Sequence, residues 1–126
     1  MIKYLLLTTL AFAASVQASG AETPLTDWSL ILVDGQPAGY SATLNLGEPG
    51  RVTGQAPCNR YFADLTWNGA AFTLGAIGAT KMACVQIAGE AGFFQTLQGI
   101  ETAEMTAGTL TLSGGGHVMV FVQPLN

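Results

Sequence analysis

Two cysteines are the residues of this chain whose chemistry is easiest to specify. Cys58 and Cys84 are its only cysteines. An even cysteine count favours a disulfide in an exported chain, and closing a loop of about 26 residues would stabilise the fold by roughly 3 to 4 kcal/mol. Two buried reduced cysteines and a reactive pair are the alternatives, but the Cys-x-x-Cys spacing of redox motifs is absent and no histidine lies nearby in sequence. We therefore predict a Cys58–Cys84 disulfide.

Polar side chains close to the cysteines are candidates for binding. Asn59 follows the first cysteine, where its amide is predicted to organise a turn, with ligand binding as the alternative. Arg60 and Lys81 would be brought together by the disulfide as a small basic spot. Such a spot can meet a carboxylate or a phosphate of a ligand, or it can pair with Glu90 or Asp64.

Groups able to catalyse a reaction are few in this sequence. Glu90 is a lone carboxylate, whereas glycoside chemistry needs two at a defined separation, so we interpret it as a structural partner for Lys81 or a backbone amide. His117 is the only histidine, and no spacing of His, Cys and carboxylates predicts a zinc site. Neither a nucleophile elbow nor a phosphate-binding loop is found. We therefore expect no enzymatic activity, no metal and no cofactor.

The predicted binding surface combines the residues discussed above with one neighbouring aromatic side chain. Its members are Asn59, Arg60, Tyr61, Lys81 and Glu90. The expected partner is another protein or a small apolar ligand.

Short strands separated by glycine-rich turns must position these residues. The alternating or apolar runs that predict strands span residues 28–33, 41–46, 51–54, 61–67, 71–74, 101–106, 109–113 and 117–123. Asn68-Gly69 is a strong hairpin signal, because both central residues of a type I′ turn need a positive φ, and it predicts pairing of residues 65–67 with 71–74.

One segment, between residues 85 and 99, has helical periodicity. Ile87, Ala91 and Phe94 recur at helical spacing, and Gly99 lies where a helix usually stops. Phe93, Leu97 and Ile100 form an overlapping apolar stripe. The predicted fold class is α+β: a strongly curved antiparallel sheet or partial barrel of about 7–8 strands, with one main helix packed across it.

The first 18 residues have the order of an export signal. A basic start is followed by an apolar run that ends near Ala18 and is too short for a membrane span. We predict a signal peptide over residues 1–18 and an exported, periplasmic monomer without a membrane span. Cleavage would leave Ser19 first, so no cysteine is available for lipoprotein acylation. Four basic against eight acidic residues exclude the basic patch that nucleic acids require.

The ordered set of motifs resembles the META domain family, also called HslJ-like. The matching pieces are Trp28, Gly54, the run Cys58-Asn59-Arg60-Tyr61, Leu74, Ile77, the run Thr80-Lys81-Met82-Ala83-Cys84, Glu90, Phe94, Leu97 and Leu110-Thr111-Leu112. The predicted domain spans residues 25–124. Where many relatives have a glycine and then an aromatic residue, this chain has Ala63 and Leu65.

This resemblance implies a small domain with a strongly bent sheet, found on exported or envelope-associated proteins and linked to stress or drug tolerance. It brings no catalytic mechanism. The resulting hypothesis is a non-enzymatic binding or interaction module in envelope stress or drug tolerance. The alternative is a lipocalin-like carrier that holds an apolar small molecule in a slot between the sheet and the helix.

Overall fold

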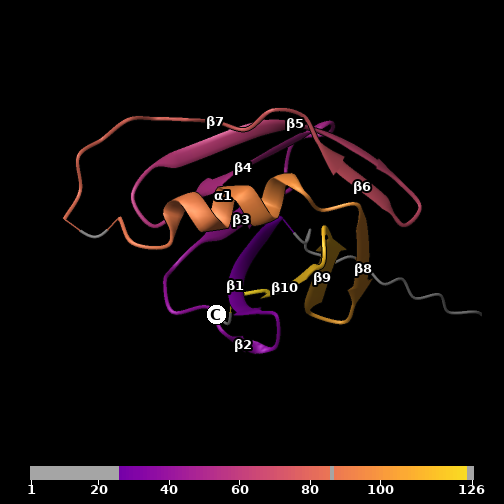
Figure 1. Ribbon diagram of the computed structural model, residues 1–126. Helices are drawn as coiled ribbons and strands as arrows, with labels where there is room; N and C mark the ends of the chain where they lie inside the picture. The colour runs from indigo at the N-terminus through magenta and orange to yellow at the C-terminus, as the bar shows by residue number, and fades with distance from the viewer. Residues whose placement is uncertain (1–25, 86, 125–126) are drawn as a thin grey trace, which may run out of the picture.

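The computed structural model describes residues 26–85 and 87–124, and the predicted signal peptide lies outside these residues. The described elements are β1 (Asp27–Val33), β2 (Gln36–Pro37), β3 (Thr43–Asn45), β4 (Arg51–Gln55), β5 (Arg60–Asn68), β6 (Ala71–Leu74), β7 (Gly78–Ala79), α1 (Glu90–Gln98), β8 (Thr102–Thr106), β9 (Thr109–Gly114) and β10 (His117–Val122). Figure 1 shows α1 lying across the strands.

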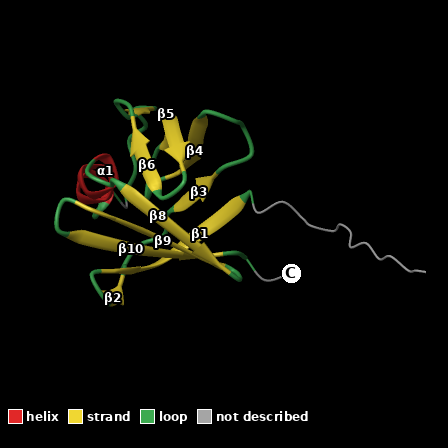
Figure 2. Ribbon diagram, turned by 90° about the vertical axis from the view of Figure 1, so that its right-hand side faces the viewer, coloured by secondary structure: helices red, strands yellow, loops and turns green. Residues whose placement is uncertain are grey.

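Eight of the strands close into an antiparallel barrel. The strand order is β1-β3-β4-β5-β6-β8-β9-β10, and β10 pairs back with β1. Two short strands lie outside this circuit, since β2 pairs with β1 and β7 pairs with β5. Figure 2 shows the curved sheet from the side, with α1 against it. The predicted fold class is therefore confirmed, and the sheet closes completely.

The barrel interior is filled by large apolar side chains. Strand β5 shows why: its buried residues Tyr61 and Ala63 alternate with the exposed Arg60, Phe62 and Asp64, as expected for a strand with one face in the core. The largest fully buried side chains are Trp28, Tyr61, Phe72, Phe93, Phe121, Leu44, Leu97, Ile100, Leu110, Leu112, Met119 and Val52. They come from seven of the eight barrel strands, from α1 and from Ile100, which follows α1, so they tie the helix to the sheet.

The β5–β6 hairpin forms as predicted, although its turn is displaced by one residue. Leu65 faces Leu74 and Trp67 faces Phe72, which is the predicted pairing. Asn68 still pairs with Ala71, however, so the two loop residues are Gly69 and Ala70 rather than Asn68 and Gly69. Gly69 has a φ of 62° and takes the first loop position, where a positive φ needs glycine.

The helix is shorter than the periodic segment that predicted it. It begins at Glu90 and ends before Gly99, so its predicted end is confirmed. Ile87 lies before the helix and is exposed, as is Ala91, so the Ile87–Ala91–Phe94 spacing does not mark the core-facing side. The overlapping stripe does, since Phe93 and Leu97 are buried.

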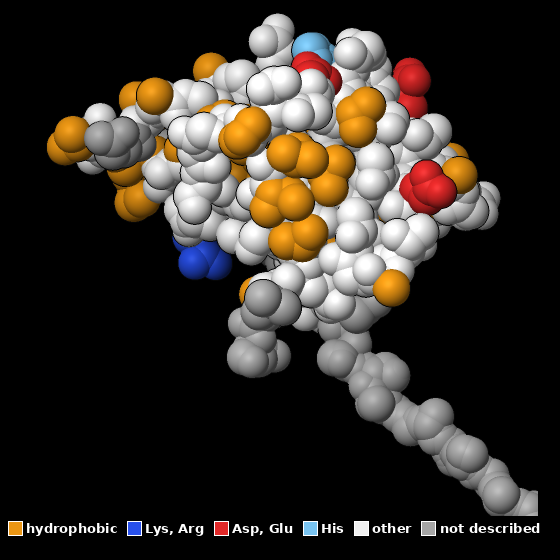
Figure 3. Space-filling view, turned by 90° about the horizontal axis from the view of Figure 1, so that it is seen from below, with side chains coloured by type: hydrophobic (Ala, Val, Ile, Leu, Met, Phe, Trp, Pro, Cys, Tyr) orange, Lys and Arg blue, Asp and Glu red, His pale blue; other side chains and the backbone are white. Residues whose placement is uncertain are grey.

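Hydrophobic side chains also gather on the outside of the barrel. Figure 3 shows hydrophobic side chains gathered in the middle of one face of the molecule. On the paired strands β1 and β10, Ile31 and Val118 are exposed and Val120 and Val122 are half-buried. Within residues 26–85 and 87–124, no helix has both the length and the apolar character to cross a bilayer.

Candidate ligand-binding groove beside the disulfide

The predicted disulfide is present and fixes one side of the site. Cys58 and Cys84 are bonded, with their Cα atoms 5.9 Å apart. Cys58 lies in the turn between β4 and β5, and Cys84 lies in the long segment between β7 and α1. The crosslink therefore holds that segment against the start of β5.

A buried carboxylate ties the same turn to the helix. Glu90 Oε1 accepts hydrogen bonds from the backbone N–H groups of Cys58 (2.7 Å) and Asn59 (2.9 Å). Its Oε2 accepts a third from Asn59 Nδ2 at 2.6 Å. Only 6% of Glu90 and 5% of Asn59 is exposed to solvent. Because the partners are 31 and 32 positions apart in sequence, this cluster joins two distant parts of the fold.

The other end of the Asn59 amide holds the segment that follows β7. Asn59 Oδ1 accepts hydrogen bonds from Thr80 Oγ1 (3.0 Å) and from the backbone N–H of Met82 (2.6 Å). The Thr80 hydroxyl in turn accepts a hydrogen bond from the N–H of Arg60. One side chain therefore connects the start of β5, the start of α1 and residues 80–82.

Two opposing effects set the pKa of Glu90. Burial disfavours the charged carboxylate and is the largest single effect, but the hydrogen bonds from the Asn59 side chain and from the two backbone N–H groups favour it. Together these donors hold the pKa of Glu90 below its ordinary value of 4.5. The carboxylate is therefore ionised at neutral pH, and its oxygens are committed to the structure.

The helix start depends on a glycine with an unusual backbone conformation. Gly89 is the N-cap residue with a φ of 89°, and its carbonyl accepts a hydrogen bond from Phe93 N–H at 2.8 Å. The Tyr40 ring covers this position, and a Cβ atom on Gly89 would lie only 2.5 Å from Tyr40 Cδ2. Glycine thus lets the chain turn tightly into α1 and places Glu90 in the first turn.

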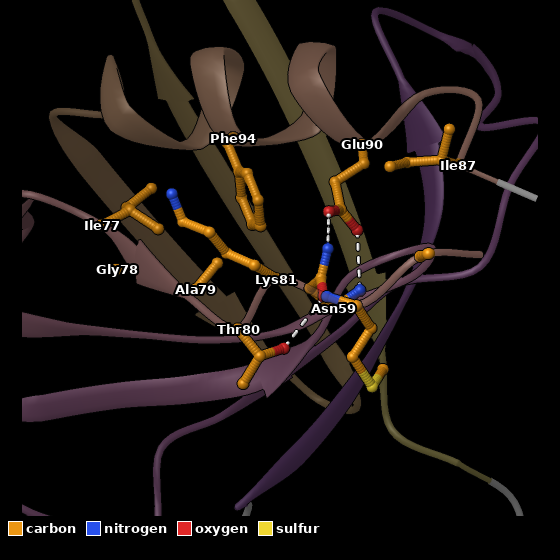
Figure 4. Close-up of a pocket in the computed structure, with 11 residues that line it drawn as sticks. Asn59, Ile77, Gly78, Ala79, Thr80, Lys81, Ile87, Glu90 and Phe94 are labelled. Atoms are coloured by element: carbon orange, nitrogen blue, oxygen red, sulfur yellow. Dashed lines mark hydrogen bonds between the residues drawn. The ribbon is translucent and has the colours of Figure 1, made fainter.

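A groove of about 720 Å³ opens between α1 and the segment after β6. Ligand sites typically have volumes of about 300–1,000 Å³. Its lining comprises Asn59, Ile77, Gly78, Ala79, Thr80, Lys81, Met82, Ala83, Ile87, Glu90 and Phe94. Met82 is 52% exposed and Ile87 is 51% exposed, so its mouth is apolar and open to solvent. Figure 4 shows Lys81 extending along the groove, past Phe94 towards Ile77.

The structure brings together only some of the predicted binding residues. Asn59, Lys81 and Glu90 line the groove, whereas Arg60 is exposed but does not belong to its lining. Neither basic side chain forms an ion pair with any described residue, and Glu90 binds Asn59 and backbone amides rather than Lys81. The interpretation of Glu90 as a partner of backbone amides is therefore confirmed.

Tyr61 requires a correction, because its side chain does not lie on a binding surface. It is 1% exposed and packs edge-on against Phe93 and Phe94 of the helix. Its hydroxyl donates a hydrogen bond to the Thr43 carbonyl at 2.6 Å, and burial raises the pKa of the phenol. Tyr61 anchors α1 to the barrel, so it shapes the groove from beneath without lining it.

Several groove residues were not recognised from the sequence. Phe94 and Ile87 were assigned to the apolar face of the helix, and Met82 and Thr80 were seen only as part of a motif. Met82 and Ile87 are exposed and lie on either side of Cys84 in the sequence. Apolar residues in a loop are a signal for a binding surface, and this signal was present in the sequence.

The single histidine lies away from the groove. His117 Nδ1 is 2.7 Å from Asp34 Oδ2, and Asp34 Oδ1 accepts a hydrogen bond from Val118 N–H. These hydrogen bonds hold the pKa of Asp34 below its ordinary value. Within the described ranges, no group of three or more His, Cys, Asp or Glu side chains is placed to hold a metal ion.

Comparison with known proteins identifies the family. The sequence model of the META domain matches residues 21–125. The chain belongs to the META domain family. This match covers the predicted domain, residues 25–124, and it includes both cysteines and Glu90. No curated protein matches this META domain at a significant level.

Solved structures share the fold of this META domain at low sequence identity. An NMR structure of a protein from Burkholderia xenovorans is 23% identical with a TM-score of 0.64, covering 90% of this chain and all of that one. A crystal structure of a DUF4847 family protein from Bacteroides vulgatus is 12% identical with a TM-score of 0.63, covering 81% of this chain and 94% of that one. At such identities the likeness concerns the fold alone.

Proposed function

We propose that this META domain protein is a non-enzymatic binding module, and that its ligand contacts the groove between α1 and residues 77–83. The observation that carries the proposal is the combination of an apolar, open mouth with a rigid rear wall. The mouth is formed by Met82 and Ile87, and the wall is held by the disulfide and the Asn59–Glu90 hydrogen bonds. A preorganised groove loses little conformational entropy when it binds.

The state of the acidic side chain supports binding rather than reaction. A general acid or base must be able to reach a proton of its substrate. Glu90 is the only carboxylate that lines the groove, and its two oxygens already accept three hydrogen bonds from the protein. Its lowered pKa also opposes a role as a proton donor near neutral pH.

The packing of the barrel favours a surface groove over the interior slot of a lipocalin-like carrier. The space enclosed by the strands is occupied by fully buried side chains, among them Trp28, Phe72 and Phe121. Small eight-stranded barrels are commonly filled in this way. A small apolar ligand would therefore be held between α1 and residues 77–83.

The proposal includes export to the periplasm and a role in envelope stress or drug tolerance. Export is supported by the signal-like residues 1–18 and by the disulfide, which persists in oxidising compartments. Fractionation of cells that express the full chain tests it. We expect a periplasmic protein whose intact mass corresponds to a chain that begins at Ser19. A cytoplasmic protein that retains Met1 would contradict export.

Titration with the apolar dye 1-anilinonaphthalene-8-sulfonate tests the groove. The wild type is expected to bind saturably. A Met82→Ser/Ile87→Ser variant should bind about thirtyfold more weakly, because two apolar contacts of roughly 1 kcal/mol each are lost. Both residues are exposed, so folding should be unaffected.

The matched control is Ile31→Ser/Val118→Ser, which removes two exposed apolar residues from the β1–β10 face. Its affinity for the dye should equal that of the wild type. Absence of saturable binding, or a loss confined to the control variant, would contradict the proposed groove.

A further inference from the structure

Strand β7 leaves one edge of its backbone unpaired along the groove. Tyr61 faces Ala79 and Phe62 faces Gly78, and this antiparallel register places Thr80 opposite Arg60. Thr80 N–H donates to the Arg60 carbonyl at 3.0 Å, so the Thr80–Arg60 pair is a hydrogen-bonded one. Hydrogen-bonded and non-bonded pairs alternate in an antiparallel ladder. The N–H and C=O groups of Ala79 therefore point away from β5.

The same edge continues at Lys81. Its neighbours Thr80 and Met82 donate their N–H groups towards β5 and Asn59. The backbone N–H and C=O groups of Ala79 and Lys81 have no partner among the described residues. They lie two residues apart, which is the spacing at which a neighbouring strand forms its hydrogen bonds. The groove thus offers a short row of backbone donors and acceptors.

At Ile77, where the groove lining begins, a side-chain amide satisfies the backbone of this segment. Gln98, at the end of α1, accepts a hydrogen bond from Ile77 N–H at 3.1 Å through Oε1. Its Nε2 donates to the Gly75 carbonyl at 2.7 Å. A side-chain amide therefore occupies the place of a strand neighbour at Ile77. Two and four residues further along, at Ala79 and Lys81, the corresponding positions are open.

The side chains around the edge define which segment fits. Ile77, Met82, Ile87 and Phe94 give the groove apolar walls. Lys81 is the only basic side chain in the lining, and no described residue forms an ion pair with it. The Glu90 carboxylate also lines the groove, but its oxygens accept hydrogen bonds from Cys58 and Asn59. The Lys81 ammonium is therefore the charged group of the groove that is available to a ligand carboxylate.

We propose that the groove binds an extended, apolar peptide segment that adds as a strand to the free edge of β7. Backbone groups of the peptide bond to Ala79 and Lys81, alternate apolar side chains contact Phe94 and Ile87, and a peptide carboxylate pairs with the Lys81 ammonium. Strand addition of this kind draws affinity from main-chain hydrogen bonds and specificity from side-chain contacts. The inference rests on the proposed function and specifies the ligand class of the same groove.

The location of the edge explains why it can remain unpaired without causing aggregation. Long, flat exposed edges pair indiscriminately with other chains. Strand β7 has only two residues, and the open edge lies in a groove beside α1. Both features limit the length of edge that another chain can pair with.

Selection from a phage-displayed library of random ten-residue peptides tests this inference on the disulfide-bonded protein. The selected peptide is synthesised with a fluorescent label, and its affinity is measured by anisotropy. Two further copies of the peptide carry N-methyl groups on alternate residues: one copy on the odd-numbered residues and the other on the even-numbered residues. An added strand presents alternate N–H groups to its neighbour. We therefore expect one copy to lose at least about tenfold in affinity, the value of one hydrogen bond, and the other to bind nearly as well.

Variants locate the bound peptide. Ala79→Pro removes an N–H group that points away from β5, so it should leave the barrel folded and weaken binding by about tenfold or more. Lys81→Ala should weaken binding of a selected peptide that carries a carboxylate several-fold. Arg60→Ala is the matched control, because it removes a nearby exposed cation that does not line the groove, and it should bind like the wild type. Hydrogen exchange of the wild type should show protection of the Ala79 and Lys81 amides on binding, whether or not Ala79→Pro folds.

The outcomes separate this inference from the proposed function. Failure to select any peptide, equal binding by both N-methylated copies, or unprotected Ala79 and Lys81 amides would overturn strand addition. If the dye still binds and the Met82→Ser/Ile87→Ser variant still weakens it, the groove remains a ligand site of another chemistry. If the wild type binds neither a peptide nor the dye, the groove is not a ligand site, and the proposed function is wrong as well.

Discussion

Truncation of the buried carboxylate, Glu90→Ala, is the most informative single perturbation of this molecule. It leaves three donors without an acceptor: the N–H groups of Cys58 and Asn59, and the Asn59 side-chain amide. Hydrogen bonds to a charged group contribute about 1.5–3 kcal/mol each, and removing one partner of a buried charged network typically costs about 3–5 kcal/mol. We expect the free energy of unfolding to fall by about 3–5 kcal/mol, whereas the total for a domain is about 5–15 kcal/mol.

A conservative variant, Glu90→Gln, refines the expectation. One oxygen remains to accept the two backbone N–H groups, but the new NH₂ group then faces Asn59 Nδ2, which is also a donor. Asn59 cannot flip its amide without loss, because its Oδ1 already accepts hydrogen bonds from Thr80 and Met82. Glu90→Gln should therefore destabilise the protein by about 1–3 kcal/mol, less than Glu90→Ala.

Urea unfolding followed by tryptophan fluorescence measures both variants, with the disulfide intact. Glu104→Ala is the matched control, since Glu104 is an exposed strand residue, and it should change the free energy of unfolding by less than about 0.5 kcal/mol. A double-mutant cycle with Asn59→Ala should show a coupling of at least about 1 kcal/mol, because the two residues share hydrogen bonds. A loss below about 1 kcal/mol for Glu90→Ala, or strict additivity in the cycle, would refute this account of the network.

Three further predictions concern the same region. The pKa of Glu90 is lowered in the folded state, so the contribution of Glu90 to stability is present when the pH is above the ordinary pKa of 4.5. This contribution is lost as the pH falls through the folded pKa. In unfolding curves measured at different pH values, Glu90→Gln should therefore flatten the decline of stability on the acid side. Replacing both Cys58 and Cys84 by serine should lower the free energy of unfolding by roughly 3.5 kcal/mol in urea titrations, the chain-entropy value for a loop of about 26 residues, and an unchanged midpoint would contradict it. Gly89→Ala should lower the unfolding temperature by several degrees in calorimetry. An alanine at a φ of 89° has a strained backbone, at a cost of about 1–3 kcal/mol, and its Cβ would also clash with the Tyr40 ring.

Local signals in the sequence were sufficient for the eight strands of the barrel, the hairpin and the crosslink, but not for the two-residue strands β2 and β7. The β5–β6 pairing followed from Asn68-Gly69 and the apolar runs on either side, because a short turn fixes the register of its two strands. The disulfide followed from the cysteine count and the expected compartment. The turn itself shifted by one residue, since a single positive-φ glycine, Gly69, was enough to close it.

Burial of the site residues was harder to predict, because it depends on partners far away in the sequence. Glu90 lacked any local partner, and its three donors lie more than 30 positions earlier. Tyr61 is different, since a signal existed: it alternates with Arg60 and Phe62 and shares the inward face of the strand with Ala63. Because alternate residues of a strand point to the same face, this alternation predicts that Tyr61 lies in the core.

The hydrogen bonds of Asn59 connect the stability of this domain to its proposed binding. The segment after β7 is held at Thr80 and Met82 by the Asn59 amide and at Cys84 by the disulfide. These anchors keep the intervening backbone in place while its outer edge has no partner among the described residues. A loop without such anchors would lose conformational entropy when it became ordered around a ligand. Destabilising Asn59 should therefore weaken ligand binding even where the ligand never contacts the amide, and the Asn59→Ala variant that serves the unfolding cycle also measures this link.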